Sequence, residues 1–334
     1  MINKIISVAG KWETILVLFI IISIILGGVL SPHFLNTENL LNQTRSFIVV
    51  GFLALGLTVV IVTGEIDLSG ESILALCAVV LGLLYRHGVN IWAASIMIVM
   101  LGSIVGAMNG MLTVFFRLPS LVVTLASLIA FRGLAFVLLE RFPIAGFPEP
   151  FVQLGNGNIG STQIPQSLVI FGIASIVVFI MLHLTIWGRR LYAIGANPVS
   201  AALSGVPIRW TKISTFILSG TMAGCATIML AARYDSVRAD AGQGLLLSIL
   251  TVVLLGGVSI FGGSGNLGGV ILSLILVGLI QNGMSLANIF SEAQKLIIGI
   301  LLILAVIIPR LISALDKYSV RPKRGLPNQP NVVD

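Results

Sequence analysis

The sequence predicts an all-α membrane protein, a polytopic bundle of about ten transmembrane helices. Of its 334 residues, 57% are hydrophobic and 9% are charged, against about 25% charged in an ordinary soluble domain. The mean hydropathy is +1.09. Apolar stretches long enough to cross a bilayer recur along the chain, and helices are the default there because backbone groups in lipid must satisfy their own hydrogen bonds. We expect residues 1–334 to form a single transmembrane domain.

Ten apolar stretches are candidates for the spans, and the third and eighth are the shortest. They are 13–32, 46–63, 71–86, 90–116, 119–141, 166–187, 213–232, 245–261, 267–288 and 293–314. The first follows Lys4 and Lys11, as in a signal peptide. It is longer than a signal peptide's apolar core and no small-residue cleavage pattern follows it, so we expect a retained helix.

Basic residues are shared unequally between the two sides that ten spans would create. With both termini inside, the inner segments hold 12 of the 19 Lys and Arg residues and the outer segments hold six. The positive-inside rule therefore places both termini, the tail 315–334 and the loop 188–212 in the cytoplasm. The loop 142–165 falls outside. The net charge of +7 is scattered in short gaps without the basic and aromatic pattern of a nucleic-acid binder.

The loop 188–212 interrupts the apolar pattern with a short helix that carries its own start and stop signals. Asn197 is suited to cap its first turn, and Pro198 to occupy its first position, where the missing N–H is harmless. Gly205 suits the left-handed residue that follows a helix. About two turns result, which is too short for a stable isolated helix.

Two interpretations of this short helix fit the spacing. Val199, Ala202 and Leu203 share one face, and that face either lies on the bilayer surface or docks on another protein. In the first case the nearby basic side chains would meet lipid phosphates. These are Arg189, Arg190 and Arg209.

Four stretches together resemble the membrane subunits of bacterial sugar importers of the ATP-binding-cassette class. The similar branch serves ribose, xylose, arabinose, galactosides and autoinducer-2. The four stretches are "GRRLYAIGANPVSAALSGVPI" at 188–208, "GEIDLSGES" at 64–72, "LVVTLASLIAFRGLA" at 121–135 and "VVLLGGVSIFGGSGNLGG" at 252–269. The chain departs from the family pattern at Gly70 and Glu71, where relatives have valine and glycine. It also departs at 242–250, which lacks their aromatic and acidic residues.

The resemblance implies that the chain is one of several subunits of a transporter in a bacterial inner membrane. ATP and magnesium would be used by a separate ATPase subunit, a solute-binding protein would dock outside, and a second copy or a homologous permease would complete the channel. This chain would bind no cofactor or metal. The loop 188–212 would couple to the ATPase through a set of residues that the resemblance supplies: Arg189, Arg190, Gly195, Asn197, Val199, Ala202, Leu203, Gly205 and Arg209.

No catalytic motif contradicts this division. The chain has no G-x-x-x-x-G-K-[ST] phosphate loop, so we do not expect it to hydrolyse ATP. Its three histidines, His33, His87 and His183, are dispersed, which favours neither a metal cluster nor a catalytic triad. We therefore expect a transport subunit and not an enzyme.

Charged residues inside the apolar stretches are candidates for a translocation path. Glu65, Asp67 and Glu71 lie between two spans, either in a solvated cytoplasmic turn or in a broken helix that faces the path. Arg132 lies within the fifth span, where a charge costs about 2.5–3.5 kcal/mol on insertion scales. We expect Arg132 to have a buried polar partner.

A weak internal repeat adds two asparagines to the candidates. A shift of 173 residues superposes Gly51 on Gly224, Asp67 on Asp240, 79–81 on 252–254, and Asn109 on Asn282. The shift corresponds to five spans, so the two halves would have opposite orientations, which is typical of transporters. The predicted path residues are Asp67, Asn109, Arg132 and Asn282.

The function that these observations favour is a permease subunit of a binding-protein-dependent importer for a sugar or sugar-like solute. The alternative is an ion-coupled secondary carrier for a small polar solute, which would need no ATPase. Such a carrier is expected to place acids deep in its spans, whereas the acids here crowd at predicted span ends. A membrane scaffold would explain the hydrophobicity but not the capped helix in the loop 188–212.

Overall fold

The computed structural model describes residues 2–139 and 142–319, with side chains described for 12–139 and 142–307. Residues 320–334, most of the predicted tail 315–334, lie outside this part. The elements are α1 (Ile2–Leu30), α2 (Thr37–Val62), α3 (Gly70–Arg86), α4 (Ile91–Phe115), α5 (Ser120–Leu139), β1 (Ile144–Ala145), α6 (Glu149–Asn156), α7 (Gln166–Phe179), the π-helix η1 (Ile180–Leu184), α8 (Ile186–Ala196), α9 (Pro198–Leu203), α10 (Ile208–Tyr234), β2 (Ser236–Val237), α11 (Leu245–Leu255), α12 (Leu267–Leu286) and α13 (Ser291–Ser319).

The described helices form a polytopic membrane bundle, as predicted. Seven are long and apolar enough to cross a bilayer: α1 from Trp12, α2, α4, α5, α7 with η1, α10 and α12. Two of the predicted spans, α3 and α11, are short, with 17 and 11 residues. The side chains of α13 are described as far as Ile307. The count of ten spans therefore stays a prediction.

Helix boundaries differ from the predicted spans where polar residues continue a helix or glycine ends one. α2 begins at Thr37 and not at residue 46, because Asn36 caps it by accepting the Glu38 N–H at 3.0 Å. Its polar first turns also find partners inside the bundle. α11 ends at Leu255 and not at residue 261, since Gly257 has a φ of +84° that an α-helix cannot use.

The predicted outer loop 142–165 contains structure that the sequence did not indicate. Strand β1 pairs with β2 in antiparallel register, with Ile144 opposite Val237. Helix α6 is held by Phe151, whose side chain is fully buried. The carboxylate of Asp235 accepts the Phe147 N–H at 2.7 Å and fixes the chain between β1 and α6.

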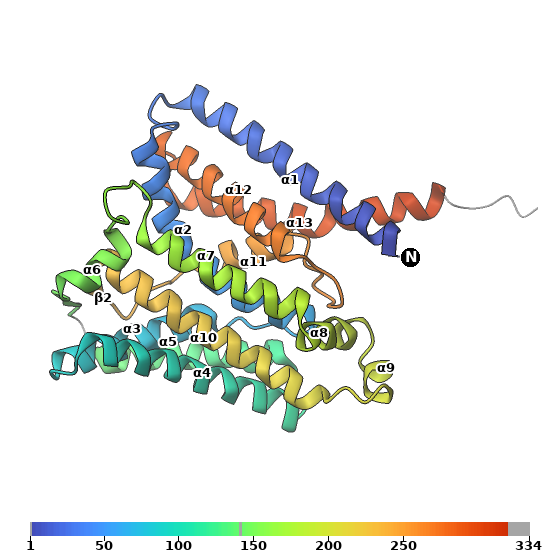
Figure 1. The fold of residues 1–334 in the computed structure, drawn as a ribbon, viewed down its shortest axis with the longest axis horizontal. Helices are drawn as coiled ribbons and strands as arrows, with labels where there is room; N and C mark the ends of the chain where they lie inside the picture. Colours follow the sequence, from blue (N-terminus) through green and yellow to red (C-terminus); the bar gives the residue numbers. More distant parts are fainter. Residues whose placement is uncertain (1, 140–141, 320–334) are drawn as a thin grey trace, which may run out of the picture.

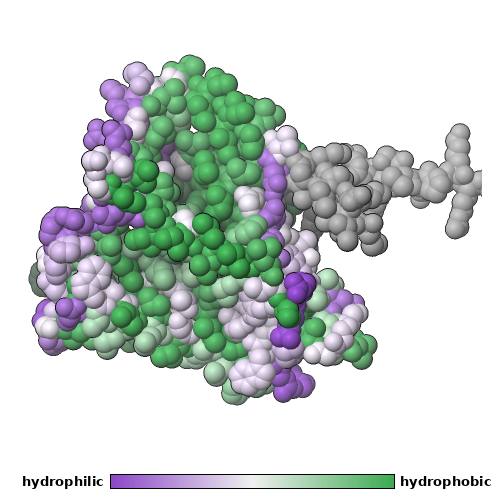
Figure 2. Space-filling model, in the orientation of Figure 1, coloured by the Kyte–Doolittle hydropathy of each residue, from purple (hydrophilic) through white to green (hydrophobic). Residues whose placement is uncertain are grey.

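The two ends of the bundle carry different elements (Figure 1). α6 and β2 lie at one end, and α8 and α9 lie at the other. Hydrophobic residues form a broad band between these ends, and hydrophilic residues concentrate at the two edges (Figure 2). This distribution is what a bilayer requires of a spanning bundle. The end with α8 and α9 is the one predicted to be cytoplasmic.

Helices α4 and α10 pack with their backbones in contact. A Cβ at Gly102 or Gly106 of α4 would overlap backbone carbonyls of α10, and a Cβ at Gly220 would overlap the Gly102 carbonyl. In lipid, helices associate through such close van der Waals contact because no hydrophobic force draws them together. These glycines give α10 its central position in the bundle.

The elements fall into an order that agrees with the internal repeat. Asp67 and Asp240 each lie in a non-helical segment ahead of a short helix, α3 or α11, and Asn109 and Asn282 lie in α4 and α12. Helices α2 and α10 are antiparallel: Glu65, just after α2, pairs with Lys212 near the start of α10. At the other end of the pair, the final turn of α10 contacts an early turn of α2, where Arg233 donates to Ser46 at 2.9 Å. The two helices that the shift superposes are therefore antiparallel, as an inverted repeat requires, and the repeat itself stays a prediction.

The end with α8 and α9 is predicted to be cytoplasmic, and reporter fusions test this. A fusion after Lys212 should report the cytoplasm and a fusion after Gly155 should report the outside, because basic residues favour the inner side. Activity of a periplasmic and a cytoplasmic reporter at both sites is the measurement. A cytoplasmic signal at Gly155 would contradict the number of spans between α5 and α7.

Candidate functional site

The predicted capped helix is present as α9, in the loop between α8 and α10. Asn197 has extended backbone angles and its side-chain oxygen accepts the Ser200 N–H at 3.0 Å. Pro198 occupies the first helical position. Gly205 has a φ of +78°, the left-handed conformation that ends a helix. The residues that the sequence singled out as helix signals therefore have those roles.

Helix α8, which precedes α9, was not predicted. It begins after Thr185, whose hydroxyl accepts the Gly188 N–H at 3.2 Å and so caps the first turn. Leu191 and Ile194 of α8 are buried against the bundle. The threonine three residues ahead of Gly188 is the signal that could have revealed this helix.

The predicted docking face of α9 is open. Val199 is 70% exposed and Leu203 is 86% exposed, and Ala202 between them is also exposed. Ala201 faces the other way and is buried. The basic residues assigned to the coupling loop are exposed as well: Arg189, Arg190 and Arg209.

Gly195 joins this loop to the rest of the bundle. A Cβ at this position would overlap the Val62 carbonyl at the end of α2 and the backbone nitrogen of Gly263. The Gly263 N–H donates to that same Val62 carbonyl at 2.9 Å. Tyr192 adds a hydrogen bond from its hydroxyl to the Gly265 carbonyl at 2.8 Å, and burial raises the pKa of Tyr192 to about 12, so the hydroxyl keeps its proton. The loop 188–212 is thus tied to two other segments through backbone contacts.

The segment 64–69, between α2 and α3, is a non-helical break inside the bundle. Asp67 is 3% exposed. Its carboxylate accepts the Ser69 N–H at 2.9 Å, the Ser69 hydroxyl at 2.5 Å and the Ser219 hydroxyl of α10 at 2.7 Å. Asp67 therefore does not lie in a solvated turn, and a non-helical break separates α2 from α3. That this break faces the transport path stays a prediction.

Asn109 extends the same buried network into α4 and α5. Its side-chain nitrogen donates to the Ser69 hydroxyl at 2.9 Å, and its oxygen accepts the Ser127 hydroxyl at 2.6 Å. Asn109 has no exposed surface. Asp67 and Asn109, predicted separately, are therefore two bonds apart in one network. Sequence reasoning missed the serines that connect them, because serine is common and has no distinctive spacing here.

A second broken segment, 236–244, lies between α10 and α11 and is held by Arg132. One guanidinium nitrogen of Arg132 donates to the carbonyl of Ala239 at 3.3 Å and to that of Ala241 at 2.7 Å. The other lies 3.5 Å from a carboxylate oxygen of Glu71. The expected buried partner of Arg132 is thus confirmed.

The chain's two departures from the family pattern are in contact with each other. The Glu71 carboxylate, at the start of α3, accepts the N–H of Leu246 in the first turn of α11 at 2.9 Å. An anion is favourable at a helix N-terminus, where N–H groups lack partners within the helix. The Glu71 carboxylate therefore contacts both the Arg132 guanidinium and the first turn of α11. The short helices α3 and α11 meet at their N-termini.

Asn282, the fourth predicted path residue, lies apart from the other three. Its amide exchanges two hydrogen bonds with Asn39, at 2.9 and 3.0 Å, and donates to Gln43 at 3.3 Å. Both partners belong to the first turns of α2, ahead of the predicted span. This pairing explains why α2 continues beyond its apolar stretch.

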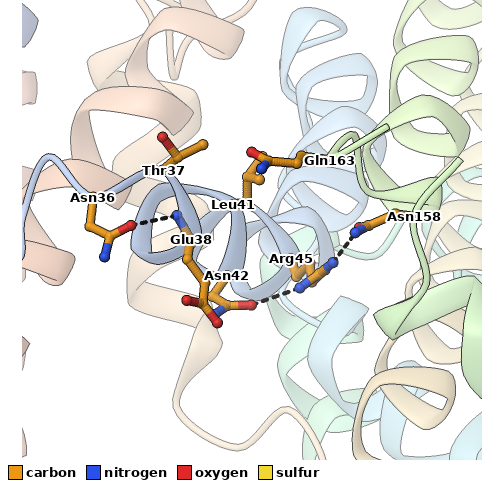
Figure 3. Close-up of a pocket in the computed structure, with 8 residues that line it drawn as sticks. All are labelled: Asn36, Thr37, Glu38, Leu41, Asn42, Arg45, Asn158 and Gln163. Carbon is orange, nitrogen blue, oxygen red and sulfur yellow. Dashed lines mark hydrogen bonds between the residues drawn. The ribbon is translucent and has the colours of Figure 1, made fainter. Parts of the chain in front are cut away.

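A polar pocket of about 520 Å³ opens at the end of the bundle away from α9 (Figure 3). Arg45 crosses it, with one nitrogen donating to Asn42 at 2.7 Å and another to Asn158 at 2.6 Å. These bonds link α2 to the segment between α6 and α7. The pocket is therefore a hydrophilic feature of the predicted outer face, lined by both segments.

The described residues show no group of three or more His, Cys, Asp or Glu side chains that could hold a metal ion. His183 of η1 accepts the N–H of Leu267, the first residue of α12, at 3.4 Å. It also lies against Phe179, with ring centroids 4.8 Å apart. Its arrangement is that of a packing residue.

Comparison with known proteins agrees with these features. A family model described as the permease component of branched-chain amino acid transport systems matches residues 39–306. The autoinducer 2 import system permease protein LsrD of Escherichia coli K12 is 34% identical over 302 residues, which cover 89% of this chain and 91% of the relative. LsrD of Shigella flexneri matches to the same extent.

No solved structure matches the chain. The family match covers most of the described bundle, from the first turns of α2 into α13, and includes the capped loop and both broken segments. The four motifs that resemble importer subunits all lie within it. The chain belongs to the family of permease subunits of ATP-binding-cassette import systems.

Proposed function

We propose that this chain moves a sugar or sugar-like solute inward, using ATP that a separate subunit hydrolyses. The family and its LsrD relatives establish a membrane permease of an import system. The observation that supports the separate ATPase is the open apolar face of α9, where Val199, Ala202 and Leu203 are exposed while Ala201 on the other side is buried. The chain's lack of a phosphate loop supports it as well.

We infer that the docking face meets a protein and not the bilayer surface, because import systems of this family include an ATPase subunit. Burying one aliphatic side chain of this size is worth about 1.5–3 kcal/mol, and Val199 and Leu203 together present two. Ala202 lies between them and lets another backbone approach closely. The coupling residues Arg189, Arg190, Gly195, Asn197, Gly205 and Arg209 then frame the contact or hold the loop in place.

A movement of α9 would be transmitted to segment 64–69 and to the loop after α11 through the backbone contacts of Gly195. Gly195 touches the end of α2, which leads directly into segment 64–69, and touches Gly263 in the loop after α11. The ion pair between Glu65 and Lys212 ties the same segment to the start of α10. We infer that the path runs beside these segments, with Asp67, Asn109, Arg132 and Asn282 in or next to its walls.

The remaining partners follow from the family. A second copy of this chain or a homologous permease would complete the channel, with both termini in the cytoplasm. A solute-binding protein would dock on the outer face, where the pocket beside Arg45 offers a hydrophilic surface of fixed shape (Figure 3).

One observation favours the second candidate, an ion-coupled carrier. The Asp67 carboxylate is buried and, among the described residues, is hydrogen-bonded only by neutral groups. Buried carboxylates of this kind serve as proton or ion sites in carriers. The open face of α9 and the family membership favour the importer.

The use of a separate ATPase subunit can be tested by copurification and ATPase assays. The purified chain should show no ATPase activity, because it has no phosphate loop. Coexpressed with its ATPase subunit in lipid, it should retain that subunit, and activity should rise with the loaded binding protein. Transport without any ATPase subunit would instead establish the ion-coupled carrier.

The coupling role of α9 predicts that Ala202→Glu releases the ATPase. A bulky charge in the dry contact should weaken retention of the ATPase subunit about tenfold or more, since losing one buried aliphatic contact corresponds to at least a factor of ten. Pull-down from membranes is the measurement. The variant should still insert, because position 202 lies outside the spans.

Ala193→Glu is the matched control. It makes the same substitution at an exposed residue of α8 outside the docking face, so it should keep the subunit. The bilayer-surface interpretation predicts a different order, with neutralisation of Arg189 and Arg190 more harmful than Ala202→Glu. If Ala202→Glu retains the subunit and transports normally, the docking role of α9 is wrong.

The path proposal predicts that access to the broken segments changes during transport. Cysteines at Asp67, Asn109, Arg132 and Asn282, in a chain lacking Cys77 and Cys225, should label slowly at rest because these side chains are largely buried. ATP-driven turnover of the complete importer should accelerate labelling by a water-soluble thiol reagent. Ser95→Cys, buried on α4 away from both segments, controls for general loosening. Equal rates with and without ATP would assign the four residues to packing.

A further inference from the structure

A second pocket, of about 480 Å³, lies along the broken segment 236–244. It is bounded by α2 at Ser46 and Val49 and by the final turn of α10. Its lining combines apolar surface with several polar side chains: Arg233, Tyr234, Ser236, Arg238, Asp240 and Gln243. Except for Asp240, which the internal repeat pairs with Asp67, none of them was singled out by the sequence, and none belongs to the coupling loop.

The pocket is held in shape from behind by Arg132. That guanidinium binds the carbonyls of Ala239 and Ala241, while the side chain of Asp240, between them, lines the pocket. Gly242 has a φ of +70° and its position lies against Leu74. The backbone that presents Asp240 is therefore fixed on its inner side by a buried charge.

The polar groups of the pocket are also fixed relative to each other. Arg238 donates two hydrogen bonds to Asp240, at 2.8 and 2.9 Å. Arg233 is bonded to Ser46 and lies over the ring of Tyr234, 5.9 Å from its centroid. Tyr234 is 63% exposed, and the side-chain amide of Gln243 makes no hydrogen bond to another described residue.

These groups suit a ligand with several hydroxyls. Asp240 and Arg238 neutralise each other, and Arg233, which is bonded to Ser46, adds one positive charge to the lining. A carboxylate has about four acceptor sites and a guanidinium has five donors, so each keeps capacity beyond their mutual bonds. A sugar hydroxyl both donates and accepts, and the C–H face of a sugar ring packs on an exposed aromatic ring. Few well-placed polar groups in a concave site are typical of small-molecule recognition.

We propose that this pocket is a subsite for a small, neutral, polyhydroxylated solute, bound by Asp240, Arg238 and Gln243 and stacked on Tyr234. The proposal rests on the proposed function and deepens it, because it selects a hydroxylated cargo over an aliphatic amino acid. The subsite lies on the predicted outer side, where a solute released by a binding protein would arrive.

The test is protection of a cysteine placed in the pocket. The reporter is Ser236→Cys in the full chain lacking Cys77 and Cys225, in lipid nanodiscs, with a water-soluble maleimide. The probes are D-ribose, D-xylose, L-arabinose and D-galactose, each at high concentration, with L-leucine for contrast. At least one sugar should slow labelling severalfold, and leucine should not. The same sugar should leave a cysteine at Ser161, an exposed residue outside the pocket, unprotected.

Asp240→Asn identifies the group responsible. It should raise the sugar concentration for half-maximal protection about tenfold or more, because hydrogen bonds to a charged group are the strong ones. Glu149→Gln, at an exposed outer carboxylate bonded only to Gln153 among the described residues, should leave protection unchanged. Labelling without sugar reports whether each variant is folded.

Each outcome decides a separate question. If no sugar protects, if leucine protects as well as the sugars, or if Asp240→Asn protects like the parent, the subsite is wrong. Pull-down of the ATPase subunit from the same membranes tests the importer role independently. A chain that keeps its ATPase subunit but shows no protection loses only the subsite, and a chain that shows protection without an ATPase subunit loses only the importer role.

Discussion

The structure depends on satisfying the backbone of two non-helical segments inside a helical bundle. Peptide groups that are neither helical nor hydrated need side-chain partners, and helix α5 supplies several of them. Ser120 accepts the Ile66 N–H at 3.1 Å, and Thr124 donates to the Ile66 carbonyl at 3.2 Å. Arg132 donates to two backbone carbonyls of 236–244. These polar residues of α5 therefore lie where the non-helical backbone needs partners.

The same breaks connect the ends of the molecule. Segment 64–69 begins at the junction with Gly195 and ends at α3, whose Glu71 meets the first turn of α11. Segment 236–244 leads into that same turn. Contacts between the loop 188–212 and segment 64–69 therefore continue to the first turn of α11 through the Glu71 carboxylate, which the two short helices share.

The sequence by itself determined the class of the molecule and its local signals. Composition and span length specify a helical membrane bundle, because lipid leaves the backbone few choices. Asn197, Pro198 and Gly205 specify α9, since caps act within one turn. The charge in the fifth span indicated a buried partner for Arg132. The repeat paired Asp67 with Asp240, and each lies in a break.

Only the tertiary structure decided which residues meet. Glu71 and Leu246 are 175 positions apart, and Asp67 and Ser219 are 152 apart, so no local pattern predicts either contact. α8 and α6 were missed because their stability comes from burying Leu191, Ile194 and Phe151 and not from periodicity. The start of α2 was misplaced because its polar residues bind Asn282. Long-range hydrogen bonds, which depend on the assembled fold, decided these features.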